Sequence, residues 1–182
     1  MENINIYPSL EDVRCRIISA IVNLYRYDRE LIEINANERS ITHKLAEHLQ
    51  REFPHWHVDC EYNRLGRDIK KLNLNFDNIQ ADDLEAKTIF PDIIVHHRCT
   101  RDNLLVIEVK KADIETNTYD EEKLLAFGQD ENYRYRFGLF LRLGSNGCKE
   151  VQFYIEGKNN REEGKLLHQL IQENLEVLGY GR

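Results

Sequence analysis

The sequence predicts an α/β fold in which a central β-sheet is flanked by helices. Two observations carry this prediction: apolar residues recur at helical spacing in four stretches, and short runs rich in branched apolar residues lie between those stretches. A chain of 182 residues is long enough for one well-cored domain and too short for two ordinary ones. With no internal repeat and no linker rich in Pro, Gly or Ser, we expect a single domain over residues 1–182.

Four segments have the pattern of amphipathic helices. In the first, Ser9 and Asp12 form the Ser-x-x-Asp capping box that often begins a helix. The second ends before Pro54, which cannot continue a helix, and Glu38 falls on its apolar stripe. The predicted helices cover residues 10–27, 38–53, 121–135 and 161–178.

Five segments are predicted as strands. Two of them, 90–98 and 103–111, are the clearest, because they are rich in Ile, Leu and Val and are separated by a short polar loop. We expect these two to pair in antiparallel orientation. Residues 66–88 are polar and predict a long connection. The predicted strands cover residues 55–65, 90–98, 103–111, 137–143 and 150–156.

Charged residues interrupt the two clearest strands on one face. Side chains alternate along a strand, so Val106, Glu108 and Lys110 share a face, and Asp92 comes close to Glu108 if the strands pair with those faces aligned. Two close carboxylates resist being ionised together unless a cation compensates. Oxygen ligands favour Mg²⁺ or Mn²⁺ over Zn²⁺, and Lys110 can reach the same space with a positive charge.

The order and spacing of these residues resemble the PD-(D/E)XK nuclease superfamily. Pro91-Asp92 is followed, sixteen positions after Asp92, by Glu108-Val109-Lys110. An acidic residue, Glu38, occupies the matching place on the preceding helix, and a Gln-x-x-x-Tyr spacing follows on the next one, at Gln129 and Tyr133. The resemblance covers about residues 38–143 and implies a restriction-endonuclease-like core, a mixed β-sheet flanked by helices.

The resemblance also implies roles for individual residues. Asp92 and Glu108 would bind Mg²⁺ or Mn²⁺, with the Val109 carbonyl as a backbone ligand and Glu38 supporting the site through water. Lys110 would orient or activate the attacking water and stabilise charge on the phosphorus centre. The expected activity is hydrolysis of phosphodiester bonds in DNA, and the whole catalytic set is Glu38, Asp92, Glu108 and Lys110.

Substrate contacts are expected from two further groups of residues. Gln129 and Tyr133 are expected to border the site. The net charge of −7 disfavours binding of a polyanion by the chain as a whole, so a local basic patch is needed. The best such patch is Arg64, Arg67, Lys70 and Lys71.

Plainer interpretations compete with each of these assignments. Glu108 and Lys110 also fit the solvated face of an edge strand. Glu38 also suits a helix start, where Asn35 with Glu38 resembles a cap. Ordinary helix packing explains Gln129 and Tyr133, and a solvated loop explains the basic patch. The histidines are left outside the ligand set, with His96 the first to reconsider.

The function hypothesis has two rivals. One is a non-cutting subunit or nucleic-acid-binding module that retains the fold and works with a partner, and the other is an unrelated sheet protein in which the motif is accidental. A homodimer is a further expectation, because many nucleases of this type cut two strands as dimers.

Cellular location is predicted from what the sequence lacks. It has no run of about 18 apolar residues and no basic segment followed by an apolar one near its start, so a cytoplasmic protein without membrane association is expected. The four cysteines are scattered without a Cys-x-x-Cys pair, which is typical of reduced structural thiols.

Overall fold

The computed structural model describes residues 7–62, 64–65, 68–69, 90–114 and 118–180. Within them the chain runs from a helical N-terminal part through a sheet to a closing helix. The elements in order are α1 (Leu10–Tyr27), α2 (Arg29–Glu33), α3 (Glu38–Glu52), β1 (His57–Cys60), β2 (Arg64–Leu65), β3 (Asp68–Ile69), β4 (Ile93–His96), β5 (Asn103–Lys111), α4 (Thr118–Gln129), β6 (Phe137–Gly144), β7 (Gly147–Ile155), β8 (Lys158–Asn159) and α5 (Arg161–Val177).

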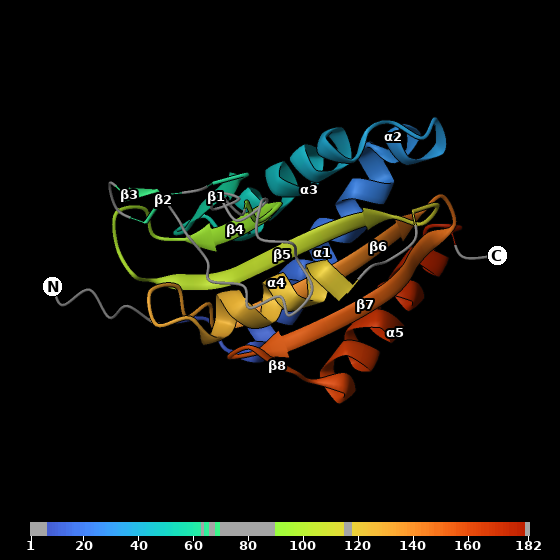
Figure 1. The fold of residues 1–182 in the computed structure, drawn as a ribbon. Helices are drawn as coiled ribbons and strands as arrows, with labels where there is room; N and C mark the ends of the chain where they lie inside the picture. The colour runs from blue at the N-terminus through green and yellow to red at the C-terminus, as the bar shows by residue number, and fades with distance from the viewer. Residues whose placement is uncertain (1–6, 63, 66–67, 70–89, 115–117, 181–182) are drawn as a thin grey trace, which may run out of the picture.

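The main sheet has six strands in the order β1-β4-β5-β6-β7-β8. Strands β5 and β6 are parallel, whereas every other neighbouring pair in this sheet is antiparallel, so the sheet is mixed. Parallel neighbours need a crossover connection, and α4 provides it. The crossover therefore places α4 against the sheet beside β5 and β6 (Figure 1). Strands β2 and β3 form a separate two-stranded sheet.

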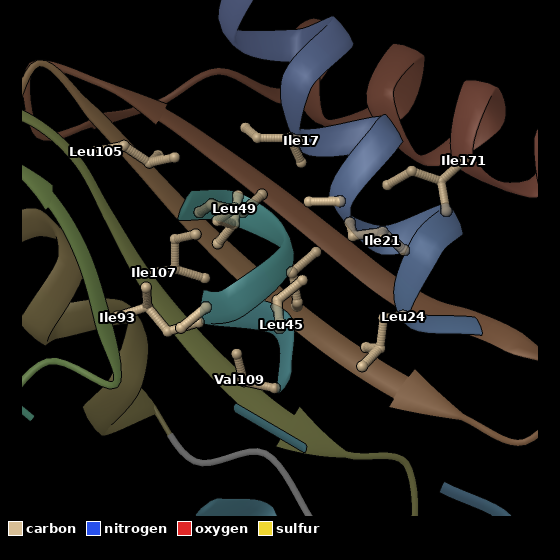
Figure 2. Packing of buried hydrophobic residues seen from close by; sticks show 14 of the residues in the cluster. Ile17, Ile21, Leu24, Leu45, Leu49, Ile93, Leu105, Ile107, Val109 and Ile171 are labelled. Carbon is tan, nitrogen blue, oxygen red and sulfur yellow. The ribbon is translucent and has the colours of Figure 1, made fainter. Parts of the chain in front are cut away.

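One face of the sheet carries the larger apolar core. Helices α1, α3 and α5 cover this face, and β5 contributes Leu105, Ile107 and Val109 to it. Figure 2 shows these strand residues facing Ile17 and Ile21 of α1 and residues of α3 and α5. All five of the named side chains are at most 1% exposed. Burial of such side chains contributes roughly 1.5–3 kcal/mol each, so this face carries much of the stability.

The opposite face of the sheet is covered by α4. Its core is smaller and more aromatic, with Val106 of β5 and Ile94 of β4 packed against Phe127 of α4. Because side chains alternate, the same strand that fills the larger core with Ile107 presents Glu108 to the α4 face. A charged residue thus lies at the end of an aromatic cluster.

Several predicted elements agree with the structure. The helix over 10–27 and the strand over 103–111 have the predicted bounds, and Ser9 and Asp12 form the predicted capping box. The two clearest strands do pair in antiparallel orientation. The prediction of a central sheet flanked by helices is confirmed, and the four cysteines are free.

The helix predicted over 121–135 is displaced. It begins at Thr118 and ends at Gln129, because the backbone then turns and Arg134 adopts a left-handed φ of 40°. The amide of Tyr135 donates to the carbonyl of Phe127, which fixes this turn. The strand predicted over 55–65 is divided into β1 and β2, and β4 is shorter than predicted. Strand β7 begins earlier, and the short elements α2, β3 and β8 were not predicted.

No helix in the part of the chain that the structure describes is long and apolar enough to cross a membrane.

Candidate functional site

The candidate site lies where β4 begins beside β5. The first residue of β4, Ile93, pairs with Ile107, so β5 extends past this point without β4 as a neighbour. There the backbone amide of Val109 donates to Oδ2 of Asp92 at 2.8 Å. Asp92 thus precedes the strand in which it was predicted. Its carboxylate accepts the hydrogen bond that a backbone carbonyl of β4 would accept if the strand began earlier.

Glu108 is the most buried charged residue of the site. Its exposed fraction is 0%, and its Oε2 accepts a hydrogen bond from Nζ of Lys123 at 2.6 Å. Its other oxygen, Oε1, is buried without a hydrogen-bond partner among the residues that the structure describes. Burial and the nearby Asp92 raise the pKa of Glu108 well above its usual value, and Lys123 opposes this shift. A buried carboxylate oxygen without a donor is costly and rare, which marks this position for a role beyond packing.

Asp92 shares the electrostatic environment of Glu108. Burial raises its pKa, the hydrogen bond from Val109 and the charges of Lys123 and Lys110 lower it, and Glu38 raises it again, with a net increase. Both carboxyl groups therefore favour the protonated form more than usual, chiefly because burial disfavours their charged form.

Lys110 of β5 forms ion pairs with residues of both α3 and α4. Its Nζ lies 3.2 Å from Oε1 of Glu38 on α3 and 3.6 Å from Oδ2 of Asp120 on α4. Burial lowers its pKa, but Asp120, Glu38 and Asp92 raise it more, so the net shift is upward. Lys110 therefore remains a cation at neutral pH, held between carboxylates.

Glu38 is the first residue of α3. The helix is capped by Asn37, whose side chain accepts from the amide of Ser40 at 2.8 Å, so the predicted cap by Asn35 is wrong. Glu38 instead reaches Lys110, and its Oε2 is buried without a hydrogen-bond partner in the described part of the chain. An acid at this end also complements the helix dipole, but that effect does not require an ion pair with Lys110.

The edge-strand interpretation of Glu108 and Lys110 is wrong. Strand β5 lies between β4 and β6 in the interior of the sheet, and Glu108 is fully buried. Solvation therefore does not explain the charge of Glu108, and Lys110, whose side chain is 22% exposed, is paired with Glu38 and Asp120. The structure brings together all four residues that the sequence predicted for the site: Glu38, Asp92, Glu108 and Lys110.

Two site residues were missed in the sequence. Asp120 and Lys123 of α4 are only 4% and 6% exposed, and each pairs with a different charged side chain of β5. A signal for them exists, because they lie three positions apart on the stripe that also carries Leu124 and Phe127. Two charged residues on the apolar side of a helix indicate oppositely charged partners on the sheet that the helix packs against.

The donors at this site fit a hard divalent cation. They are carboxylate oxygens, two of which, on Glu108 and Glu38, have no hydrogen-bond partner within the described ranges. The carbonyl of Val109 adds another oxygen, because the carbonyl and amide of a strand residue point to the same side and the amide faces Asp92. Oxygen ligands suit Mg²⁺ or Mn²⁺. Within the described ranges, no three His, Cys, Asp or Glu side chains already form a metal-binding group.

Gln129 and Tyr133 do not lie on one helix, so the predicted Gln-x-x-x-Tyr placement on a helix is wrong, while their contact with substrate stays a prediction. Helix α4 ends at Gln129, whose side-chain amide donates to the carbonyl of Gly157 at 2.8 Å. Tyr133 lies beyond the helix, is 3% exposed and packs edge-on against Phe127. Both residues therefore have packing roles on the α4 face.

A pocket of about 720 Å³ opens beside the site. Glu38 and Asp92 line it together with Arg39 and His43, which lie one turn apart on the exposed side of α3. Of the predicted basic patch, Arg67, Lys70 and Lys71 and the side chain of Arg64 lie outside the described residues. Their role stays a prediction.

His96 lies on the same sheet face as Glu108 but has another partner. Its Nε2 is 2.9 Å from Oδ2 of Asp59, a carboxylate that also accepts from Arg98. This pairing accounts for His96 without a metal, in agreement with its omission from the ligand set.

Comparison with known proteins adds no family assignment. No family model matches the chain, and no curated protein is significantly similar to it.

Proposed function

We propose that the protein is a divalent-metal-dependent nuclease of the PD-(D/E)XK type, with a restriction-endonuclease-like core, that hydrolyses phosphodiester bonds in DNA. The observation that carries the proposal is Glu108, a fully buried carboxylate close to Asp92, with one oxygen that has no partner among the described residues. The mixed sheet, the antiparallel pairing of β4 with β5 and the position of Glu38 are compatible with that core.

Each residue has a distinct part in this proposal. Asp92 and Glu108 would hold the cation, with the Val109 carbonyl and Glu38 as additional oxygen donors. When bound, Mg²⁺ or Mn²⁺ polarises phosphoryl oxygens and lowers the pKa of coordinated water. Lys110, kept charged by Glu38 and Asp120, can orient the attacking water and stabilise negative charge that develops on the phosphate.

The pocket beside the site is the proposed path of the substrate backbone. Arg39 is largely exposed, and its guanidinium can exchange its surface ion pair with Glu61 for a phosphate oxygen. His43 lies on the same side of α3. A strand that follows this pocket reaches Asp92 and Glu38.

A second function is favoured by the pairing of Lys123 with Glu108. The lysine already supplies a positive charge to this carboxylate at 2.6 Å. A protein that kept the fold and a metal-binding remnant but did not cut would be stabilised by such a pair in its metal-free state. It would act as a non-cutting subunit or nucleic-acid-binding module.

Cleavage assays separate the two functions. Wild-type protein is incubated with plasmid, linear duplex DNA, single-stranded DNA and RNA in Mg²⁺ or Mn²⁺, and compared with Asp92→Ala and Lys110→Ala. Loss of one interaction to the transition state costs about 100-fold or more in rate, so both variants should lose at least that much. Lys111→Ala is the matched control, since this neighbouring lysine contacts Asn35 on another side.

The outcomes are distinct when circular dichroism shows that the variants remain folded. Cleavage that both variants lose supports the nuclease. Metal binding without cleavage on any substrate supports the non-cutting function. A wild-type protein that neither cuts nor binds metal contradicts both.

A further inference from the structure

Lys123 occupies an unusual position for a lysine. Its side chain is only 8% exposed, and its ammonium lies 2.6 Å from Oε2 of Glu108, whose side chain is 1% exposed. Lysine is almost never fully buried unless it is paired, because desolvation of the ammonium costs free energy. Lys123 lies outside the Pro91-Asp92 and Glu108-Val109-Lys110 pattern, since it comes from α4.

The ammonium of Lys123 lies where its positive charge acts on the carboxylates of both Glu108 and Asp92. Besides its contact with Glu108, it acts electrostatically on Asp92. These are the two side chains that the proposed function assigns to the metal. A single positive charge from α4 therefore partly compensates the pair that a divalent ion would compensate more fully.

Lys123 also has a second partner that does not belong to the site. Its Nζ lies 5.7 Å from the centre of the Tyr119 ring, within the range of a cation–π interaction. The ammonium can therefore leave Glu108 and retain a favourable contact. Glu108 in turn keeps an oxygen, Oε1, that Lys123 does not engage.

From this arrangement we infer that Lys123 is an internal counter-ion for Glu108 that is displaced when a divalent cation binds, and that it sets the metal affinity of the site. The inference rests on the proposed function, because it needs Asp92 and Glu108 to be metal ligands. Lys123 is a positioning residue: it holds the carboxylates together in the metal-free protein and competes for them with the cation.

The test compares wild type with Lys123→Met at increasing Mg²⁺ concentration. Isothermal titration gives the metal affinity, and thermal unfolding gives the stability of the metal-free and metal-bound protein. Measurements at pH 8.5 limit competition by protons for the carboxylates. Lys158→Met is the control, because this exposed lysine lies on β8, the edge strand of the sheet, and not on α4.

Lys123→Met should bind Mg²⁺ about tenfold more tightly, since no charge-assisted hydrogen bond has to be broken first. Its metal-free form should unfold at a lower temperature, and Mg²⁺ should raise that temperature more than in wild type. Lys158→Met should resemble wild type. If Lys123→Met does not fold, Lys123→Gln retains a donor for Glu108 without the charge and should show the same direction of change.

Two results would overturn parts of the assignment separately. If wild type binds Mg²⁺ and neither Lys123 variant binds it more tightly, Lys123 is only a structural partner of Glu108, and the nuclease proposal stands. If neither wild type nor the variants bind Mg²⁺, the metal site itself is wrong and the inference fails with it.

Discussion

The two faces of the sheet differ in what their buried residues do. On the face covered by α1, α3 and α5, β5 contributes Ile107 to a continuous apolar core. On the α4 face the adjacent residue, Glu108, is equally buried, but its carboxylate lies in a cluster of charges and has one oxygen without a partner in the part of the chain that the structure describes. The first arrangement lowers the free energy of the folded state and the second raises it. Stability and the proposed chemistry are therefore separated by one position along a strand.

Substitution on the apolar face should have the largest effect on stability. Ile107→Ala removes a fully buried side chain and leaves a cavity, so the free energy of unfolding should fall by about 2–5 kcal/mol. Urea denaturation measures this loss. Leu166→Ala, at a side chain that is 39% exposed, should change stability by less than about 0.5 kcal/mol. Equal effects of the two substitutions would contradict the division between faces.

Neutralising the ion pair between Glu108 and Lys123 on the α4 face should not lower the free energy of unfolding, in contrast to Ile107→Ala. Glu108→Leu combined with Lys123→Met replaces a buried pair by apolar side chains of similar size, which is neutral or stabilising by about 1–4 kcal/mol. The same double variant should lose metal binding and cleavage. Thermal unfolding without metal and Mg²⁺ titration check both statements. A strong loss of stability would show that the pair holds α4 on the sheet.

The pH dependence of the double variant sharpens this contrast. Because burial and Asp92 raise the pKa of Glu108, the folded state binds its proton more tightly than the unfolded state. Wild type should therefore lose this contribution to stability as the pH rises from about 4.5 through the raised pKa. Urea midpoints measured across this range should fall less in the double variant than in wild type.

A second ion pair on the α4 face should depend on pH in the reverse direction. Burial raises the pKa of Asp59, but Arg98 and His96 lower it more, so the net shift is downward. Asp59→Asn should cost about 1 kcal/mol at pH 6. The difference from wild type should vanish as the pH falls below 3.8 through the lowered pKa. Urea midpoints at several pH values test this, and a constant difference would contradict the assignment.

The smallest change is expected at the pocket. Arg39→Ala removes an exposed side chain, so stability should change by less than about 0.5 kcal/mol. Binding of DNA, measured by fluorescence anisotropy in Ca²⁺, should weaken about equally for all sequences and depend less on salt. Arg161→Ala on α5 is the control. Unchanged binding in Arg39→Ala would place the substrate path elsewhere.

Local patterns in the sequence predicted the parts of the fold that depend on neighbours along the chain. The cap at Ser9 and the alternation in β5 are of this kind, and both are found as predicted. The end of α4 was not predictable in this way. A Cβ atom on Gly128 would lie 2.3 Å from the amide nitrogen of Gly157, so the position of this helix depends on a contact far along the chain.

The same distinction applies to the candidate site. Asp92 and Glu108 could be placed together because strand pairing and alternation are regular. Their partner Lys123 could not, because its contact depends on how α4 docks after the crossover from β5 to β6. Likewise, Glu38 was predicted from its position on a helix, but its contact with Lys110 depends on how α3 meets the end of β5.

The late start of β4 gives the site a natural spectroscopic reporter. The Val109 amide is bonded to the carboxylate of Asp92 where a neighbouring strand would otherwise receive it. Its proton resonance and its rate of exchange with solvent therefore depend on one side chain, whereas the amides around it depend on the sheet. In a ¹⁵N-labelled sample, this single backbone signal should move whenever Asp92 changes its partner, which makes occupancy of the site visible without a substrate.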